Sequence, residues 1–257
     1  MNAMAMTDKP ALPQLPLERD LFGRVIFDHF QGRPGDYYLR RDDNFLERDT
    51  SARYFRSWEE MPSHQRCLLN HARGRVLDIG AGAGQHACVL QERGLAVTAI
   101  DASPLAIEVC RARGLHDARV MEAQEMDFPA QSFDTVLMMN NNLGIGGSPG
   151  GLRGLLLHLH ELVAPGGVIL TDKRECECTA VNPTHARYQR WNVERGWYPG
   201  SQRLRVEYDG HCGEEFDWLM ITLHDLRDLC KETGWRIARC VQVNAGDAMY
   251  AIGMERE

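Results

Sequence analysis

The chain has 257 residues, enough for one large α/β domain or for one domain with a small cap. Its formal net charge of -7 argues against nucleic-acid binding, because neutralising phosphates requires a basic surface. No apolar run approaches the roughly 18 residues that span a bilayer, and the first residues lack an apolar signal core. We therefore expect a cytoplasmic protein without membrane contact.

The eight cysteines are scattered, mostly within apolar patterns, which favours buried free thiols over a disulfide framework. An alternative is a zinc site built from Cys176, Cys178 and His185 with the pair His211 and Cys212. Their spacing matches no common zinc pattern, because the CxC pair lacks a second paired module. We expect no bound metal.

The first 60 residues differ from the rest of the chain. Three prolines interrupt the first 20 residues, which predicts a loosely attached arm. From about Leu17 to Trp58 the pattern is mixed and aromatic, and it suggests short helices that dock on a larger domain.

Predicted strands and helices alternate from Gly74 onward. Short apolar runs predict strands at RVLDIG, LAVTAID, ARVMEA, SFDTVLMM and VILTD. Helical patterns lie between them at QHACVLQERG, SPLAIEVCRARG and GGLRGLLLHLHELVAPGG, and Ser103 with Pro104 marks the start of the second helix. This alternation predicts an α/β fold with a parallel sheet and helices on both faces.

The C-terminal part predicts one more helix, TLHDLRDLCKETG, and the strands WRIARCVQVN and AMYAIGMER, joined by a short turn that contains Asn244 and Gly246. Such a hairpin makes the last strand antiparallel to the others. An insertion at about residues 174–219 precedes this helix and is rich in aromatic residues. Its strand patterns, QRLRVEYDG and EEFDWLMI, suggest a cover over the substrate; alternatively, the aromatics only pack the insertion onto the core.

The segment VLDIGAGAGQHA, residues 76–87, places three glycines between a predicted strand and a predicted helix. Glycine lets the backbone approach a ligand, and a helix N-terminus offers free N–H groups. A turn without a ligand would also use glycine. Because Gly82, Gly84 and Ala87 fit the spacing G-x-G-x-x-G/A, a nicotinamide or flavin cofactor is one alternative.

Carboxylates end three of the predicted strands. Asp78 ends the first strand, where it would repel a pyrophosphate but not a cationic ligand. Asp101 ends the second strand, where it can accept hydrogen bonds from both hydroxyls of a ribose. Glu122 ends the third strand, where it can accept from an adenine amino group while the backbone N–H of Ala123 serves a ring nitrogen. The three acids suit a neutral or positive adenosine derivative.

Four segments, VLDIGAGAG, VTAIDAS, VMEAQEMDFPAQSFDTV and LVAPGGVIL, together resemble the class I S-adenosylmethionine-dependent methyltransferases, in their small-molecule branch. The resemblance covers roughly Gly74 to Asp172 and implies a Rossmann-like, seven-stranded, mostly parallel sheet. It implies S-adenosyl-L-methionine as cofactor and S-adenosyl-L-homocysteine as product. Many members of the family have aspartate where this chain has Glu122. The residues that the resemblance places at the cofactor are Asp78, Gly80, Ala81, Gly82, Gly84, Asp101, Ala102, Glu122, Ala123 and Asn140.

The predicted fourth strand runs into LMMNNNLGIGGSPGG. Ligands of open α/β sheets lie outside the carboxyl ends of the strands. By the resemblance, Asn140 meets the methionine portion of the cofactor, while Asn141 and Asn142 face the substrate; alternatively, this is a loop of turn-forming residues. The segment lacks the Asp/Asn-Pro-Pro-aromatic sequence of nucleic-acid amino methyltransferases, which makes base amines unlikely as substrates.

Weaker candidates for the substrate pocket are Tyr54, Asn141, Trp197, Tyr208 and His211. His211 and His185 are the candidate general bases, because either can titrate near neutral pH. We assign no catalytic residue. The resemblance also favours a division into an N-terminal arm and helical lid, residues 1–60, and a methyltransferase core, residues 61–257, with the insertion as a substrate cover.

The sequence thus predicts a methyltransferase that transfers a methyl group to an unidentified small molecule by in-line displacement. Two alternatives remain open. One is an NAD(P)-dependent oxidoreductase, and the other is a protein that binds S-adenosylmethionine without catalysis.

Overall fold

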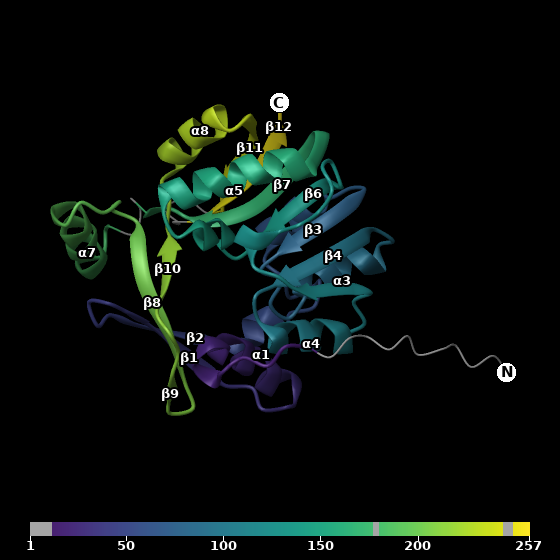
Figure 1. Ribbon diagram of the computed structural model, residues 1–257. Helices are drawn as coiled ribbons and strands as arrows, with labels where there is room; N and C mark the ends of the chain where they lie inside the picture. The colour runs from purple at the N-terminus through teal and green to yellow at the C-terminus, as the bar shows by residue number, and fades with distance from the viewer. Residues whose placement is uncertain (1–11, 177–179, 244–248) are drawn as a thin grey trace.

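A computed structural model describes residues 12–176, 180–243 and 249–257 (Figure 1). The larger of its two sheets has seven strands in the order β11-β12-β7-β6-β3-β4-β5. They are β3 (Arg75–Ile79), β4 (Ala96–Asp101), β5 (Asp117–Val120), β6 (Phe133–Met138), β7 (Val163–Arg174), β11 (Trp235–Gln242) and β12 (Met249–Arg256). Strands β3 to β7 pair in parallel, and β12 is antiparallel to both of its neighbours. The predicted Rossmann-like fold with an antiparallel last strand is confirmed.

Helices cover both faces of this sheet, because successive side chains of a buried parallel strand point to opposite faces. Leu77 packs with α5 (Pro149–Leu162) and α8 (Leu223–Glu232) on one face. Val76 packs on the other face with α2 (Ser63–Leu69), α3 (Gln85–Glu92) and α4 (Pro104–Ala112). The predicted cap is present, since Ser103 Oγ accepts from the backbone N–H of Ala106 and Pro104 begins α4.

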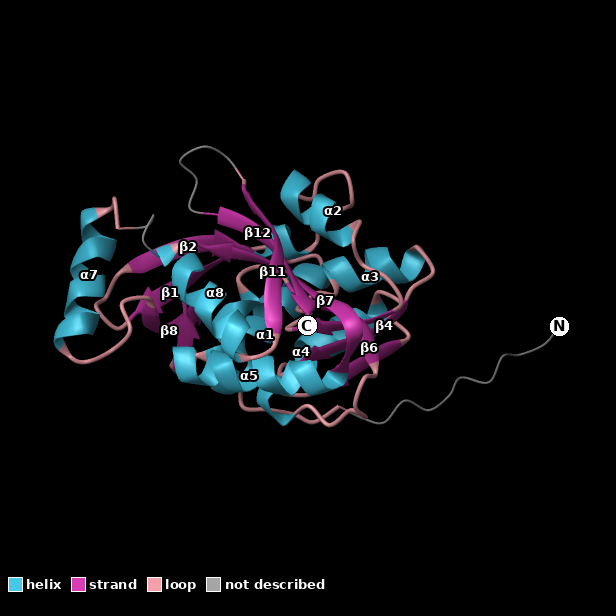
Figure 2. Ribbon diagram, turned by 90° about the horizontal axis from the view of Figure 1, so that it is seen from above, coloured by secondary structure: helices cyan, strands magenta, loops and turns pink. Residues whose placement is uncertain are grey.

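The smaller sheet joins the N-terminal segment to the insertion. Its order is β10-β8-β1-β2, and β9 pairs with β8; every pairing is antiparallel. The strands are β1 (Asp36–Arg41), β2 (Leu46–Thr50), β8 (Ser201–Tyr208), β9 (His211–Cys212) and β10 (Phe216–Leu219). The two predicted strands of the insertion are therefore confirmed. Beside them the insertion carries α7 (Pro183–Glu194), which both views place at the edge of the molecule (Figure 2).

The prediction of only short helices before Trp58 is wrong for residues 36–50. This segment does contain α1 (Leu21–Phe30), with short 3-10 turns at Leu17–Arg19 and Ser51–Tyr54, but a β-hairpin lies between them. The hairpin forms because β1 pairs with β8, and Arg40 donates to Glu207 across 167 positions of sequence. A local pattern cannot reveal such a distant partner. The predicted turn with Asn244 and Gly246 lies outside the described residues.

The stretch after β6 packs under the smaller sheet. It forms a 3-10 turn, η4 (Asn142–Gly146), against β10. Gly144 is required there, because a Cβ atom on it would lie 2.3 Å from the indole ring of Trp218. Among the described residues, no helix is long and apolar enough to cross a membrane.

We predict that Gly144→Ala lowers the free energy of unfolding by about 1–3 kcal/mol, because the added methyl group forces the Trp218 ring and β10 to move. Denaturant unfolding followed by tryptophan fluorescence measures this change. Gly154→Ala on α5 is the control: nothing lies within 4 Å of its added Cβ atom, so it should be neutral or stabilise by about 0.5–1 kcal/mol. Equal stability of the two variants would contradict the packing argument.

Candidate active site

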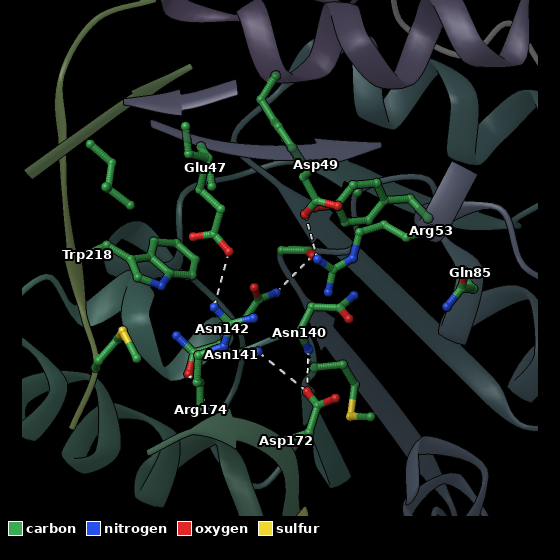
Figure 3. Close-up of a pocket in the computed structure, with 18 of the residues that line it drawn as sticks. Glu47, Asp49, Arg53, Gln85, Asn140, Asn141, Asn142, Asp172, Arg174 and Trp218 are labelled. Carbon is green, nitrogen blue, oxygen red and sulfur yellow. Dashed lines mark hydrogen bonds and ion pairs between the residues drawn. The ribbon is translucent and has the colours of Figure 1, made fainter. Parts of the chain in front are cut away.

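A cavity of about 400 Å³ lies between the carboxyl ends of the parallel strands and the smaller sheet (Figure 3). Its floor contains the glycine loop that follows β3, the asparagines after β6 and Asp172 near the end of β7. Tyr37, Leu39 and Trp218 are among the residues that the smaller sheet contributes. The cavity is therefore shared by the two sheets.

The glycine loop depends on conformations that favour glycine. Gly80, Gly82 and Gly84 have φ angles of 68°, 55° and 72°, in the left-handed region. A Cβ atom on Gly80 would lie 2.5 Å from the amide nitrogen of Asn142. That amide donates to the carbonyl oxygens of Ile79 and Gly80 at 2.8 and 3.0 Å, so it holds the loop against the turn after β6.

Asp78 provides a buried carboxylate beside this loop. Its side chain lines the cavity but is only 1% exposed, and its Oδ2 atom has no hydrogen-bond partner among the described residues. Burial, and then the nearby Asp101 carboxylate, raises the pKa of Asp78 to about 7, and a hydrogen bond from the backbone of Ala87 offsets only part of this rise. A buried carboxylate with an unsatisfied oxygen is costly, and an ammonium group would satisfy it. The site therefore fits the amino group of an amino-acid ligand.

Asp101 stands at the end of the neighbouring strand, β4. Its carboxylate accepts hydrogen bonds from the backbone N–H groups of Gly82, at 2.8 Å, and Ser103, at 2.9 Å. Burial raises the pKa of this carboxyl group. Further along the same edge of the sheet, Ala102 and Glu122 are exposed and Ala123 is buried.

Five of the ten predicted cofactor residues are not among the residues that line the cavity. Asp101, Ala102, Glu122 and Ala123 lie along the strand ends beside it, and Gly84 begins α3. Gly82 lines the cavity and donates to Asp101, which places the two regions next to each other. The contacts of these residues with ribose and adenine remain predictions.

Two consecutive asparagines form a turn after β6. Asn140 and Asn141 have φ angles of 58° and 64°, which are uncommon for residues other than glycine. The carboxylate of Asp172 accepts from both of their backbone N–H groups, while Asn141 Oδ1 accepts from the backbone N–H of Arg174 at 3.0 Å. Both asparagines line the cavity, and their contacts with cofactor and substrate stay predictions. Backbone strain maintained by such contacts is typical of functional sites.

Asp172 also binds α2 through two side chains that the sequence analysis missed. Its Oδ2 atom lies 3.1 Å from His64 Nε2 and 2.7 Å from Gln65 Nε2, and Gln65 reaches Asn140 Oδ1 at 3.0 Å. Burial alone would raise the pKa of Asp172, but the hydrogen bonds from His64 and Gln65 outweigh it and hold the pKa below its usual value. Asp172 is therefore a carboxylate at neutral pH.

A signal for Asp172 was present in the sequence, because it ends a predicted strand as Asp78 and Asp101 do. His64 carried no such signal, since α2 is short and lies outside the glycine-loop motif. His86 of α3, whose Nε2 atom lies 3.3 Å from Gln65 Oε1, is buried, and burial lowers its pKa to about 4. It is therefore neutral under ordinary conditions.

The substrate-pocket predictions divide into two groups. Tyr54 and Asn141 line the cavity, and the Tyr54 hydroxyl lies 2.6 Å from that of Tyr37. Trp197, Tyr208 and His211 are not among the residues that line it.

Each of these three has another environment. Trp197 covers the guanidinium of Arg195, Tyr208 donates to Asp28, and His211 is exposed on β9. The aromatic composition of the insertion does not show which of its side chains face the cavity. Phe216 and Trp218 of β10 line it and the three residues above do not, because the pairing of β8 with β1 decides which side chains face the cavity.

His185 is at the cavity, but its chemistry argues against a general base. Its Nδ1 atom lies 3.0 Å from the guanidinium of Arg41. Burial and then this cation lower the pKa of His185, so it is a weaker base than an ordinary histidine. Among the described residues, no group of three or more His, Cys, Asp or Glu side chains could hold a metal ion, and Cys178 lies outside them.

Comparisons with known proteins agree with this fold and loop. Residues 76–167 match a family model described as a methyltransferase domain. A solved S-adenosylmethionine-dependent methyltransferase from Bacteroides fragilis, in complex with S-adenosyl-L-homocysteine, is 29% identical. It superposes with a TM-score of 0.78 over 96% of this chain and 98% of the other.

Two curated relatives match over shorter segments. A demethylmenaquinone methyltransferase from Tropheryma whipplei is 28% identical over 47% of this chain and 50% of its own length. A phosphatidylethanolamine N-methyltransferase from Cereibacter sphaeroides is 33% identical over 37% of this chain and 55% of its own length. This chain thus spans about half the length of the curated relatives that it matches.

The sheet order and the glycine loop define a methyltransferase of the Rossmann-like type. With the family model over residues 76–167 and the Bacteroides structure, they show a methyltransferase domain with the fold of S-adenosylmethionine-dependent methyltransferases.

We predict that Asp78→Asn stabilises the protein without ligand at pH 8. The pKa of Asp78 in the folded protein is raised to about 7, whereas its pKa in the unfolded chain is about 4. The stability of the folded protein is therefore highest, as far as Asp78 is concerned, below pH 4, and this stability is lost as the pH rises through 7. The variant should gain about 2–4 kcal/mol at pH 8 and little at pH 4.

Thermal unfolding at both pH values measures this difference. The control is Asp134→Asn, because hydrogen bonds from Arg75 lower the pKa of Asp134, and its loss should destabilise the protein at pH 8. A lower melting temperature for Asp78→Asn at pH 8 would contradict the assignment of a poorly satisfied buried charge.

Proposed function

We propose that this chain transfers a methyl group from S-adenosyl-L-methionine to a small molecule bound in the shared cavity. The observation that carries the proposal is the buried carboxylate of Asp78 beside a glycine loop, whose Oδ2 atom has no partner among the described residues. A cofactor with an α-ammonium group satisfies this carboxylate. When bound, the cofactor supplies a methyl group on a positively charged sulfur, which is open to in-line attack.

The residues of the cavity suit both ends of the cofactor's amino-acid portion. Asp78 takes the ammonium group. Arg56 also lines the cavity, and its backbone N–H donates to Gln85 of α3 at 2.9 Å, so it comes from the side of the glycine loop. Arg56 takes the carboxylate. Asn140, held by Asp172 and Gln65, contacts the same portion of the cofactor.

The adenosine half extends along the strand ends beside the cavity. Asp101 exchanges its hydrogen bond from Gly82 for hydrogen bonds from the ribose hydroxyls, and Ala102 lies beside the ribose. Glu122 and Ala123 serve the adenine ring. This placement continues the order of β3, β4 and β5 along one edge of the sheet.

Several features favour a small acceptor over a macromolecule. The cavity of about 400 Å³ is covered by the smaller sheet, and the net charge is -7. Residues of β1, β2, β8 and β10 provide this cover, and Tyr54, in the 3-10 turn after β2, also lines the cavity. In this proposal the predicted lid and the predicted cover act together, because their strands β1, β2, β8 and β10 form one sheet beside the cavity. The cytoplasmic location stays a prediction.

The alternatives fit the site less well. A nicotinamide dinucleotide would place a pyrophosphate at the glycine loop near Asp78, a carboxylate that would repel it. A binding protein without catalysis would not need a covered space for a second ligand beside the cofactor. Methyl transfer to a fraction of a metabolite extract separates the enzyme from this alternative.

We predict that S-adenosyl-L-homocysteine binds in calorimetric titration and that Asp101→Ala weakens this binding by more than tenfold, because the ribose hydroxyls lose their acceptor. Glu108→Ala, at an exposed position on α4, is the control and should leave the affinity unchanged. Binding of NADH at micromolar concentration, without any response to S-adenosyl-L-homocysteine, would exclude the proposed function.

The affinity for S-adenosyl-L-homocysteine should also depend on pH through Asp78. The empty site holds Asp78 protonated below pH 7, since burial raises its pKa to about 7, and ammonium binding requires the carboxylate. We predict about tenfold weaker binding at pH 6 than at pH 8. Asp78→Asn should bind weakly and without this dependence; the same pH dependence in the variant would assign it to another group.

A further inference from the structure

We propose that His64, oriented by Asp172, is the general base that removes a proton from the methyl acceptor, and that the acceptor is an uncharged, flat, apolar molecule with a hydroxyl or N–H group. This inference rests on the proposed function and extends it to the acceptor. The sequence patterns indicate no catalytic residue, and His185 and His211 are the only candidate bases that they suggest.

The geometry of the pair resembles that of an oriented base. His64 Nε2 lies 3.1 Å from Asp172 Oδ2, and the side chains are 15% and 1% exposed. A carboxylate only accepts hydrogen bonds, so the neutral ring carries its proton on Nε2 and leaves Nδ1 as the free acceptor. Asp172 therefore fixes the ring and stabilises the imidazolium that forms when Nδ1 takes a proton.

The pair stands where the acceptor and the cofactor meet. Asp172 accepts from the backbone N–H groups of Asn140 and Asn141, and all three residues line the cavity with His64. Figure 3 shows Asp172 below the asparagines, with Glu47 and Trp218 of the smaller sheet across the cavity. A base at this position can reach an acceptor held between the two sheets.

The other titratable groups of the cavity are unsuited to this role. His86 has a pKa lowered to about 4 by burial, and His185 lies against Arg41. Burial raises the pKa values of Tyr37 and Tyr54, so both keep their protons at neutral pH. Two further carboxylates, Glu47 and Asp49, are engaged by Arg174 and Arg53.

The lining of the smaller sheet indicates the chemistry of the acceptor. Its side chains toward the cavity are mostly aliphatic or aromatic: Leu39, Leu204, Val206, Phe216 and Trp218, with Phe45 from the β1–β2 turn. The arginines on this side are paired, Arg41 with Asp43, Arg53 with Asp49 and Arg174 with Glu47. An apolar ring between aromatic side chains fits this lining, whereas an anionic acceptor would have to break an ion pair.

The step balances as a displacement assisted by a base. His64 Nδ1 takes the proton as the O–H or N–H bond of the acceptor breaks. The electron pair released forms the new bond to the methyl carbon, and the electron pair of the old carbon–sulfur bond stays on sulfur, which becomes neutral. The imidazolium then returns its proton to water. Without the base, the acceptor would remain protonated and a poor nucleophile.

The surroundings of His64 allow this cycle. Asp172 of β7 is the charged group in direct contact with its ring, and Ala251 of β12 stands opposite Asp172 in the sheet. His86 of α3, the next titratable group in this network, contacts Gln65 and is neutral. Arg56 lines the same cavity before α2 and is engaged by the cofactor in the proposed function.

The test compares wild type with His64→Gln, whose amide can still donate to Asp172 and so keeps the fold. Labelled S-adenosylmethionine and a fractionated metabolite extract identify the acceptor fraction with the wild-type protein. On that fraction, kcat should fall about 100-fold or more at pH 7, while the affinity for S-adenosyl-L-homocysteine changes less than twofold. The defect should shrink as the pH rises to 9.5, because the acceptor then ionises without a base.

The matched control is His224→Gln. His224 forms an exposed pair with Asp228 at 3.7 Å on α8, away from the cavity, and its loss should leave kcat within twofold of wild type. A second measurement needs neither acceptor nor cofactor: ¹⁵N spectra of the histidine rings should place the proton of neutral His64 on Nε2, and Asp172→Asn should weaken this preference.

Each other outcome would overturn the inference. These are a His64→Gln activity within threefold of wild type, a defect of the same size at every pH, or a proton on Nδ1 of His64 in the wild-type protein. If the wild-type protein labels no fraction, the proposed function fails and the inference fails with it. If wild type and His64→Gln label the same fraction equally, the methyltransferase stands and only the role of His64 is lost.

Discussion

The amide of Asn142 resting on the carbonyl groups of Ile79 and Gly80 is the contact on which the site depends. It is possible only because Gly80 has no side chain. The contact joins the end of β6 to the glycine loop, and from there η4 passes under Trp218. The glycine loop, the asparagine turn and the smaller sheet therefore hold one another in position. A change in any of them should alter the shape of the cavity.

The two buried carboxylates of the cavity, Asp78 and Asp172, have different roles. Asp78 is buried with its Oδ2 atom unsatisfied among the described residues, and it is therefore suited to a cation that arrives with the ligand. Asp172 is equally buried but has four hydrogen-bond donors around it, so it stays ionised and rigid. These two carboxylates, on the strands β3 and β7 that flank β6, thus differ in function because their hydrogen-bond partners differ.

The sequence predicted the larger sheet well, because its strands and helices are local and their glycines and caps are visible. Ser103, Gly80 and Asp78 could each be placed from their position relative to a strand end. The smaller sheet could not be predicted in the same way, since its central pairing, β1 with β8, joins Arg40 to Glu207. For this reason Trp197, Tyr208 and His211 were assigned to the pocket on composition, although they lie elsewhere. His64 was missed because its partner, Asp172, is 108 positions away.

The distance in sequence between β1 and β8 has a consequence for how the protein folds. The larger sheet can form its parallel core from contiguous segments, whereas the cover requires a chain loop of more than 150 residues to close. The pairing of β1 with β8 is therefore expected to form late and to open locally without loss of the core. Such an opening would expose the cavity to solvent through the cover, giving the acceptor a path of entry that leaves the cofactor loop intact.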